Sequence, residues 1–358
     1  MQTPYFLINE DKIKQNCEIL ERVRRESGCK ILLAQKSYSC YDTYPLISKH
    51  LDGTTASGLF EAKLGHEYFG GETHVFAPAF TDADMNEIAK ICDHVVFNSV
   101  AQLQKHGSKV KSAGLRVNPE FRTQESEIYD PCAPLSRFGV TTIPDGLQFD
   151  GLHFHTLCEQ GFEPLRDTLA VFEQKFGKHL SRVKWVNFGG GHHITRDDYD
   201  VDGLIKLIKD FKSRYNVEVY LEPGEAVVLD AGTLTSTVLD IVHNQRDIAI
   251  LDTSAACHNP DIIETQHRYT PEIIETGNHQ YRFAGNTCLA GDIIGDFKSK
   301  KLNIGNTITF TNMALYTIVK TNMFNGINLP TIYVKRLDGK IEKIREFGYA
   351  DYKSRLGK

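Results

Sequence analysis

Four places in the sequence carry residue types that, brought together by a fold, could do covalent chemistry on a small molecule. Lys36, His155, a glycine triplet at residues 189–191 and Glu222 each follow an apolar run that is typical of a buried strand. Singly, each has a more ordinary interpretation, namely a solvated lysine, a structural histidine, a tight turn and a turn carboxylate. Their shared position after such runs favours one common site.

The chemistry that suits this set is that of a pyridoxal phosphate site. A lysine amine can bond the cofactor's carbonyl carbon, and bare glycine N–H groups can approach its phosphate closely. The ring of His155 can stack on a flat cofactor. Glu222, fixed by the Pro223 and Gly224 that follow it, can hold a pyridine nitrogen protonated and so strengthen the ring as an electron sink.

The elements that must position these residues alternate regularly between residues 9 and 231. The first helix is expected from residue 9 to Gly28, with further helices over 59–69, 83–92 and 204–215. The eight expected strands cover residues 30–38, 53–57, 74–79, 94–98, 115–119, 151–156, 185–190 and 218–222. This alternation predicts an α/β fold, a closed (β/α)8 barrel of the TIM type, with an open doubly wound sheet as the alternative. In such a barrel the chemistry collects at the C-terminal ends of the strands, where all four features fall.

The last third of the chain has a different sequence pattern, with few segments of helical periodicity. Runs rich in Thr, Ile and Val predict strands over residues 233–242, 248–253, 303–311, 314–320 and 331–334. We therefore predict two domains, a cofactor-binding barrel over 9–231 and a C-terminal β domain over 232–358 that includes residues 1–8. The irregular segment 120–134, with Arg122, Glu125, Glu127 and Pro131, predicts a lid or a disordered loop.

The overall composition excludes several classes of protein. The 358 residues carry a net charge of −5, which gives no basic field for nucleic acid but is compatible with a cationic substrate. The eight cysteines include no CxxC pair, so reduced thiols are expected and no metal site is predicted. The N-terminal residues do not resemble a secretion signal and no apolar run reaches membrane-spanning length, so we expect a cytoplasmic protein.

Several longer runs resemble the pyridoxal phosphate decarboxylases of the alanine racemase-like fold, which act on ornithine, arginine and diaminopimelate. The similarity extends from about Pro4 to Lys353, and within the group it is strongest to the enzymes that decarboxylate carboxynorspermidine or carboxyspermidine to norspermidine or spermidine. The runs that carry it are 32–37, 151–156, 189–191, 222–225, 251–261, 284–292 and 324–326.

The resemblance implies a role for each matching residue. Lys36 would bond the cofactor, His155 would stack on its ring, and Glu222 would pair with the pyridine nitrogen. Gly190 and Gly191 would hold the phosphate, helped by Tyr316 of the β domain. In relatives the residue that matches Cys288 enters the site from the other subunit and returns a proton to the substrate carbon, so the resemblance also implies a homodimer with shared active sites.

Two departures from the family pattern bear on the substrate. Glu225 stands where ornithine and diaminopimelate enzymes usually have a phosphate-binding arginine, and Leu289 stands where ornithine decarboxylases have an aspartate. Glu225 is therefore free to face a cation. Together with Asp261 and Asp292 it is a candidate to bind the cationic tail of a carboxylated polyamine, and Glu264 is a further acid in the same region.

The alternative functions are a diaminopimelate or ornithine decarboxylase, an amino acid racemase and a non-catalytic pyridoxal phosphate carrier. Glu225 and Leu289 argue against the first. A protonated pyridine nitrogen beside Glu222 argues against racemisation. The β domain and Cys288 argue against a carrier.

Overall fold

The computed structural model describes residues 1–124, 126–267 and 269–358. The chain divides into two compact units: residues 14–227 form the first, and residues 1–13 with 228–358 form the second. Glu125, which the sequence places in the predicted loop, lies outside the described residues. Among the helices of the described chain, none has the length and apolar character needed to cross a membrane.

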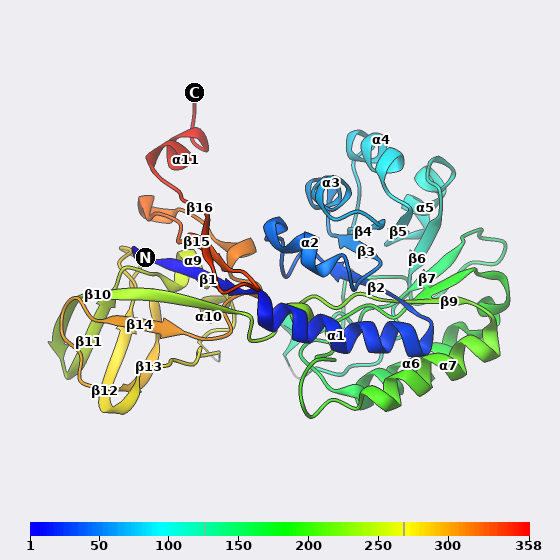
Figure 1. The fold of residues 1–358 in the computed structure, drawn as a ribbon. Helices are drawn as coiled ribbons and strands as arrows, with labels where there is room; N and C mark the ends of the chain where they lie inside the picture. The colour runs from blue at the N-terminus through cyan, green and yellow to red at the C-terminus, as the bar shows by residue number, and fades with distance from the viewer. Residues whose placement is uncertain (125, 268) are drawn as a thin grey trace. The chain divides into compact units, whose positions relative to one another are not determined.

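The first unit is built on a closed barrel of eight parallel strands with helices around it, as predicted (Figure 1). The strands are β2 Lys30–Ala34, β3 Gly53–Ala56, β4 Glu72–Phe76, β5 His94–Phe97, β6 Ala113–Arg116, β7 Gly151–His153, β8 Trp185–Asn187 and β9 Glu218–Leu221. The helices are α1 Glu10–Ser27, α2 Tyr44–Ile47, α3 Leu59–Tyr68, α4 Asp82–Ile91, α5 Val100–His106, α6 Phe162–Phe176, α7 Val201–Tyr215 and α8 Glu225–Val228.

The interior of the barrel is a packed core. Leu32, Val96, Trp185 and Tyr220 come from four different strands and form one buried cluster. The indole of Trp185 fits because β7 begins with a glycine: a Cβ on Gly151 would lie 2.0 Å from the ring. With the interior filled in this way, the rim at the C-terminal ends of the strands is left for chemistry.

The strands end earlier than the sequence predicted, and this places the functional residues in the loops. The strand that precedes Lys36 ends at Ala34, and the one that precedes His155 ends at His153. Beyond Ala34 the backbone forms local turn hydrogen bonds; for example, Tyr38 N–H donates to Gln35 O at 3.0 Å. Lys36 and His155 therefore stand on the rim rather than within the sheet.

The second unit is a mixed sheet in the order β13-β12-β11-β10-β1-β15-β16, with β14 paired to β10. Its strands are β1 Tyr5–Asn9, β10 Gly232–Asn244, β11 Arg246–Leu251, β12 Thr276–Ala284, β13 Ile293–Ser299, β14 Thr307–Phe310, β15 Thr331–Lys335 and β16 Ile341–Arg345. The short helices are α9 Ala255–His258, α10 Asp261–Glu264 and α11 Tyr349–Ser354. Its core includes Phe6 of β1 together with Phe283 and Phe310.

One predicted strand, residues 314–320, is wrong. The chain there makes local bonds instead, because Lys320 N–H donates to Thr317 O at 3.0 Å and the Thr317 hydroxyl donates to Met313 O. Tyr316 within this segment has a φ of 50°, which a strand does not allow. Four strands of the sheet, β1, β12, β13 and β16, were not predicted, although residues 1–8 were assigned to this domain.

The described part of segment 120–134 is ordered. It contains a 3₁₀ turn, Glu127–Tyr129. Arg122 Nε donates to the carboxylate of Asp130 at 2.7 Å, and the other oxygen of Asp130 accepts from Cys132 N–H at 2.8 Å. These hydrogen bonds give the described part of the segment a defined local conformation, which fits the predicted lid better than the predicted disordered loop.

Candidate active site

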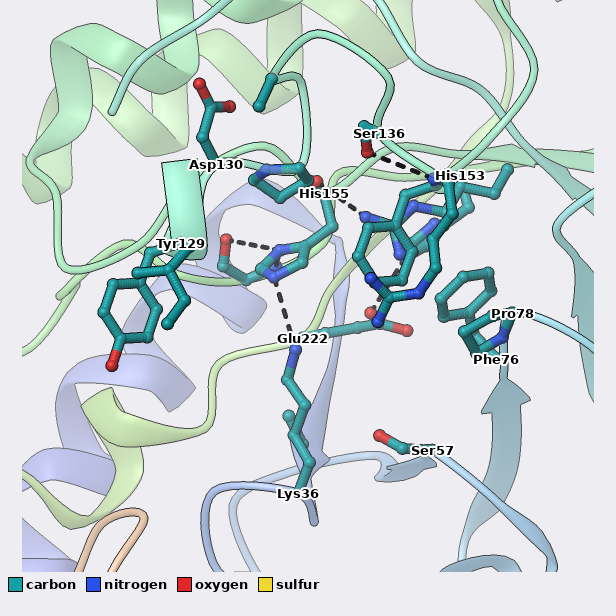
Figure 2. Close-up of a pocket in the computed structure, with 18 of the residues that line it drawn as sticks. Lys36, Ser57, Phe76, Pro78, Tyr129, Asp130, Ser136, His153, His155 and Glu222 are labelled. Carbon is teal, nitrogen blue, oxygen red and sulfur yellow. Dashed lines mark hydrogen bonds and ion pairs between the residues drawn. The ribbon is translucent and has the colours of Figure 1, made fainter. Parts of the chain in front are cut away.

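A cavity of about 620 Å³ lies at the rim of the barrel, among residues of the first unit only. Lys36, His155, Gly190 and Glu222 all line it, and so do residues 127–131 and 133–138. Figure 2 shows the side chains of Lys36, His155 and Glu222 converging within it. The structure thus brings together the four features that the sequence placed at the ends of separate strands.

Lys36 extends into this cavity toward His155, with 3.4 Å between Nζ and the ring Nε2 (Figure 2). The surrounding protein desolvates the ammonium, and with the positive charge of Arg116 this lowers the pKa of Lys36 below its usual value. The negative charges of Glu222 and Glu225 act in the opposite direction. A lower pKa increases the fraction of free amine, which is the nucleophilic form.

His155 is fixed by the glycine loop. Gly190 N–H donates to its Nδ1 at 3.2 Å. Burial, followed by the positive charges of Lys36 and Arg116, holds the pKa of His155 well below its ordinary value, so the ring is neutral at neutral pH. A neutral, oriented ring facing the cavity is suited to stacking against a flat aromatic group.

Glu222 is an ionised carboxylate inside the protein. Burial alone would raise its pKa, but His153 and hydrogen bonds from Thr55 and Asn187 hold the pKa well below the ordinary value. Asn187 Nδ2 donates to Oε1 at 2.8 Å, and His153 Nε2 lies 3.1 Å from Oε2. This arrangement stabilises a fixed negative charge, as a partner for a protonated ring nitrogen requires.

The glycine loop admits no side chains. A Cβ on Gly190 would lie 2.0 Å from Glu222 O, and one on Gly191 would lie 1.9 Å from Leu157 O. Gly189 and Gly191 have φ values of 71° and 83°, which glycine adopts readily. The loop is therefore pressed against its neighbours with its backbone bare, as close approach to a phosphate requires.

The sequence analysis missed Arg116, the last residue of β6. Its guanidinium lies against the rings of Phe76 and Phe138, 4.5 Å and 4.6 Å from their centroids, and donates to His155 O at 3.0 Å. Burial lowers its pKa to about 10, so it remains a cation. The predicted strand covered residues 115–119 and so placed Arg116 near its start, whereas β6 ends at Arg116. The correct strand end was the signal that would have found it.

Four other predicted site residues, Cys288, Tyr316, Asp261 and Asp292, belong to the second unit. Cys288 is exposed, and its N–H donates to Asn325 Oδ1 at 2.7 Å. Tyr316 is half-buried. Asp261 accepts from Lys320 Nζ at 2.7 Å, and burial raises the pKa of its carboxyl. Asp292 is buried and accepts from the hydroxyls of Ser254 at 2.9 Å and Thr287 at 2.6 Å.

Glu225 has a partner that the sequence did not reveal. Its Oε2 lies 2.5 Å from His193 Nε2, and each of the two side chains is only 10% exposed. The carboxylate that was predicted to face a substrate cation is thus already paired with an imidazole of its own chain.

Comparison with known proteins connects this site to a family. Residues 38–314 match the model of the pyridoxal-dependent decarboxylases, described as their C-terminal sheet domain. The chain belongs to this family. The predicted resemblance is thereby confirmed, and the residues at the barrel rim fit the cofactor that the family name implies: a lysine, a fixed carboxylate and a bare glycine loop share one cavity.

This decarboxylase is similar to several characterised members over its whole length. It is 44% identical to a carboxynorspermidine/carboxyspermidine decarboxylase of Campylobacter jejuni, over 99% of this chain and 98% of that protein. It is 36% identical to a carboxyaminopropylagmatine decarboxylase of Synechocystis, over 100% and 96% of the two chains. The crystal structure of carboxynorspermidine decarboxylase from C. jejuni, complexed with norspermidine, matches with a TM-score of 0.90 at 42% identity, covering 99% and 100%.

Proposed function

We propose that this decarboxylase removes CO₂ from carboxynorspermidine or carboxyspermidine and so forms norspermidine or spermidine. The observation that carries the proposal is the 44% identity with an enzyme named for these substrates, over 99% of the chain. The structure solved with norspermidine supports it, since norspermidine is the product of that decarboxylation. Relatives named as diaminopimelate decarboxylases share at most 24% identity among those compared.

The proposal is tested by measuring CO₂ release from five amino acids under identical conditions. These are carboxynorspermidine, carboxyspermidine, carboxyaminopropylagmatine, diaminopimelate and ornithine. We expect kcat/KM to be highest for one of the first two. A clear preference for diaminopimelate or ornithine would overturn the proposal, and a preference for carboxyaminopropylagmatine would favour the activity for which the Synechocystis relative is named.

We propose that pyridoxal 5'-phosphate is the cofactor and that Lys36 bonds it. His155 would lie against its ring, Glu222 would face the ring nitrogen, and Gly190 and Gly191 would contact the phosphate, with Tyr316 assisting. When bound, the cofactor supplies an electron sink for the electron pair released with CO₂. The chain's residues supply orientation, a fixed negative charge and the amine.

Asp261 is the carboxylate that we propose for binding the substrate's cationic tail. Its Oδ1 accepts from the Lys320 ammonium, and Glu264 contacts the same ammonium, so two acids surround one cation. A charged amine is therefore the kind of group that this place already accommodates. The roles of Glu225 and Asp292 at the tail stay predictions, because His193 engages the first and two hydroxyls engage the second.

Asp261→Asn should reduce kcat/KM for carboxynorspermidine by about ten- to a hundredfold, because a charge-assisted hydrogen bond contributes about 1.5–3 kcal/mol. The visible absorbance of bound cofactor should not change. Asp296→Asn serves as the comparison, since Asp296 is an exposed aspartate of the same unit that pairs with Arg282. Unaltered kcat/KM in Asp261→Asn would remove this residue from tail recognition.

We also propose a homodimer in which Cys288 of one subunit returns a proton to the substrate in the site that contains the partner's Lys36. A thiol can serve as a general acid near neutral pH, and Cys288 is the one exposed cysteine of the eight. Mixing Lys36→Ala with Cys288→Ala protein, each inactive alone, should restore activity through mixed dimers. No recovery, under conditions where tagged subunits are seen to exchange, would indicate a site built within one chain.

A further inference from the structure

The pair formed by His193 and Glu225 lies next to the glycine loop. His193 is two residues beyond Gly191, and Glu225 is three residues beyond Glu222, at the start of α8. Nε2 and Oε2 lie 2.5 Å apart, within hydrogen-bonding distance, and both side chains are 90% shielded from water.

The loop that follows β8 and the turn that follows β9 are held together at several points. Glu222 N–H donates to Gly189 O at 2.8 Å, and the Thr195 hydroxyl donates to Ala226 O at 2.7 Å. The space where Gly190 would carry a Cβ is filled by Glu222 O. The carboxylate of Glu225 is therefore fixed near the bare backbone of the glycine loop, and its charge also acts on Lys36.

A buried carboxylate beside a phosphate site repels the phosphate unless a cation stands close to it. The neighbouring guanidinium of Arg196 is not available for this, because it donates to both oxygens of Asp198, at 2.9 Å and 2.6 Å. The guanidinium of Arg116 lies against the rings of Phe76 and Phe138 and donates to His155 O at 3.0 Å. His193 is the basic side chain that the structure places in contact with Glu225.

We propose that His193 is a phosphate-binding residue: its imidazolium, anchored on Glu225, supplies the positive charge at the glycine loop for the phosphate of the cofactor. This inference rests on the proposed pyridoxal phosphate site and extends it. It also assigns a role to Glu225 that does not involve the substrate tail. The pair balances its own charge, and the imidazolium is the member that attracts the phosphate.

Binding of pyridoxal phosphate, compared with pyridoxal, which lacks the phosphate, tests this role. Protein stripped of cofactor is titrated with each compound, and the two dissociation constants are measured by absorbance or fluorescence. His193→Asn leaves the Glu225 carboxylate without its cation. We expect its affinity for pyridoxal phosphate to fall tenfold or more while its affinity for pyridoxal changes less than twofold.

The double variant His193→Asn/Glu225→Gln removes the repelling carboxylate as well, so it should recover part of the lost affinity but stay below the parent protein. The control is the similar pair of His50 Nδ1 and Glu21 Oε2, 2.6 Å apart, because His50→Asn should change neither dissociation constant. His193→Gln repeats the test if His193→Asn does not fold, as judged by its thermal midpoint.

A purely structural pair would behave differently. Its loss would weaken pyridoxal and pyridoxal phosphate alike, and the double variant would bind no better than the single one. Either result would overturn the inference and leave the cofactor site in place. If the parent protein itself bound no pyridoxal phosphate, the proposed cofactor and this inference would both be wrong.

Discussion

Lys36→Ala should leave the protein folded but without decarboxylase activity, with a fall in kcat of at least about 10⁴-fold. The structure places the Lys36 amine inside the cavity, 3.4 Å from His155, with its pKa lowered by burial and by Arg116. The alanine variant has no amine at this place to bond the cofactor. The visible absorbance of the bonded cofactor should therefore disappear, and borohydride reduction should attach no cofactor to the peptide that contains residue 36.

Lys30 provides a matched control. It is the first residue of β2, the strand that precedes Lys36, and so lies at the opposite end of that strand. Its ammonium is paired with Glu72 and does not line the cavity. Lys30→Ala should lower the thermal midpoint while keeping the absorbance band and the activity. The assignment of Lys36 would be wrong if its alanine variant kept the full band, with the cofactor trapped on a different lysine.

The barrel and its reactive rim could be predicted from sequence because both follow from local patterns. Short apolar runs that alternate with amphipathic segments indicate parallel strands, and the ends of such strands share one rim. Lys36, His155, Gly190 and Glu222 needed only this rule, and they line one cavity. Arg116 also ends a strand in the structure, but the strand predicted over residues 115–119 placed it near a strand start, so it was missed.

The remaining features depend on contacts between distant parts of the chain. β1 pairs with both β10 and β15, and each of these strands lies more than 200 residues from β1 along the sequence. β16 has the sequence Ile-Glu-Lys-Ile-Arg, which does not alternate apolar with polar residues, and it has little buried surface, so it gives a weak strand signal. The pairing of Glu225 with His193 joins two segments that follow different strands. The hydrophobic periodicity of a sequence does not indicate which residues of two such segments come into contact.

Glu222→Gln should be the second most damaging substitution, lowering kcat about 10²- to 10³-fold at saturating substrate, which is typical when one preorganised electrostatic group is removed. Three neighbours, His153, Thr55 and Asn187, hold the parent carboxylate ionised far below its ordinary pKa. Glutamine has nearly the same shape but no charge. It cannot keep a facing pyridine nitrogen protonated, so the electron sink is weakened while Lys36 still bonds the cofactor.

Two further measurements separate this electrostatic role from a structural one. Glu222→Asp keeps the negative charge on a shorter side chain, so it should retain more activity than Glu222→Gln even though it loses more packing. The cofactor absorbance and its attachment to Lys36 should persist in both variants. If the aspartate variant were the less active of the two, or if kcat fell only in proportion to the folded fraction, shape and stability would explain the effect. A carboxylate held by His153 Nε2 at 3.1 Å and Asn187 Nδ2 at 2.8 Å is costly to bury, and its fixed charge is the property of Glu222 that an amide cannot replace.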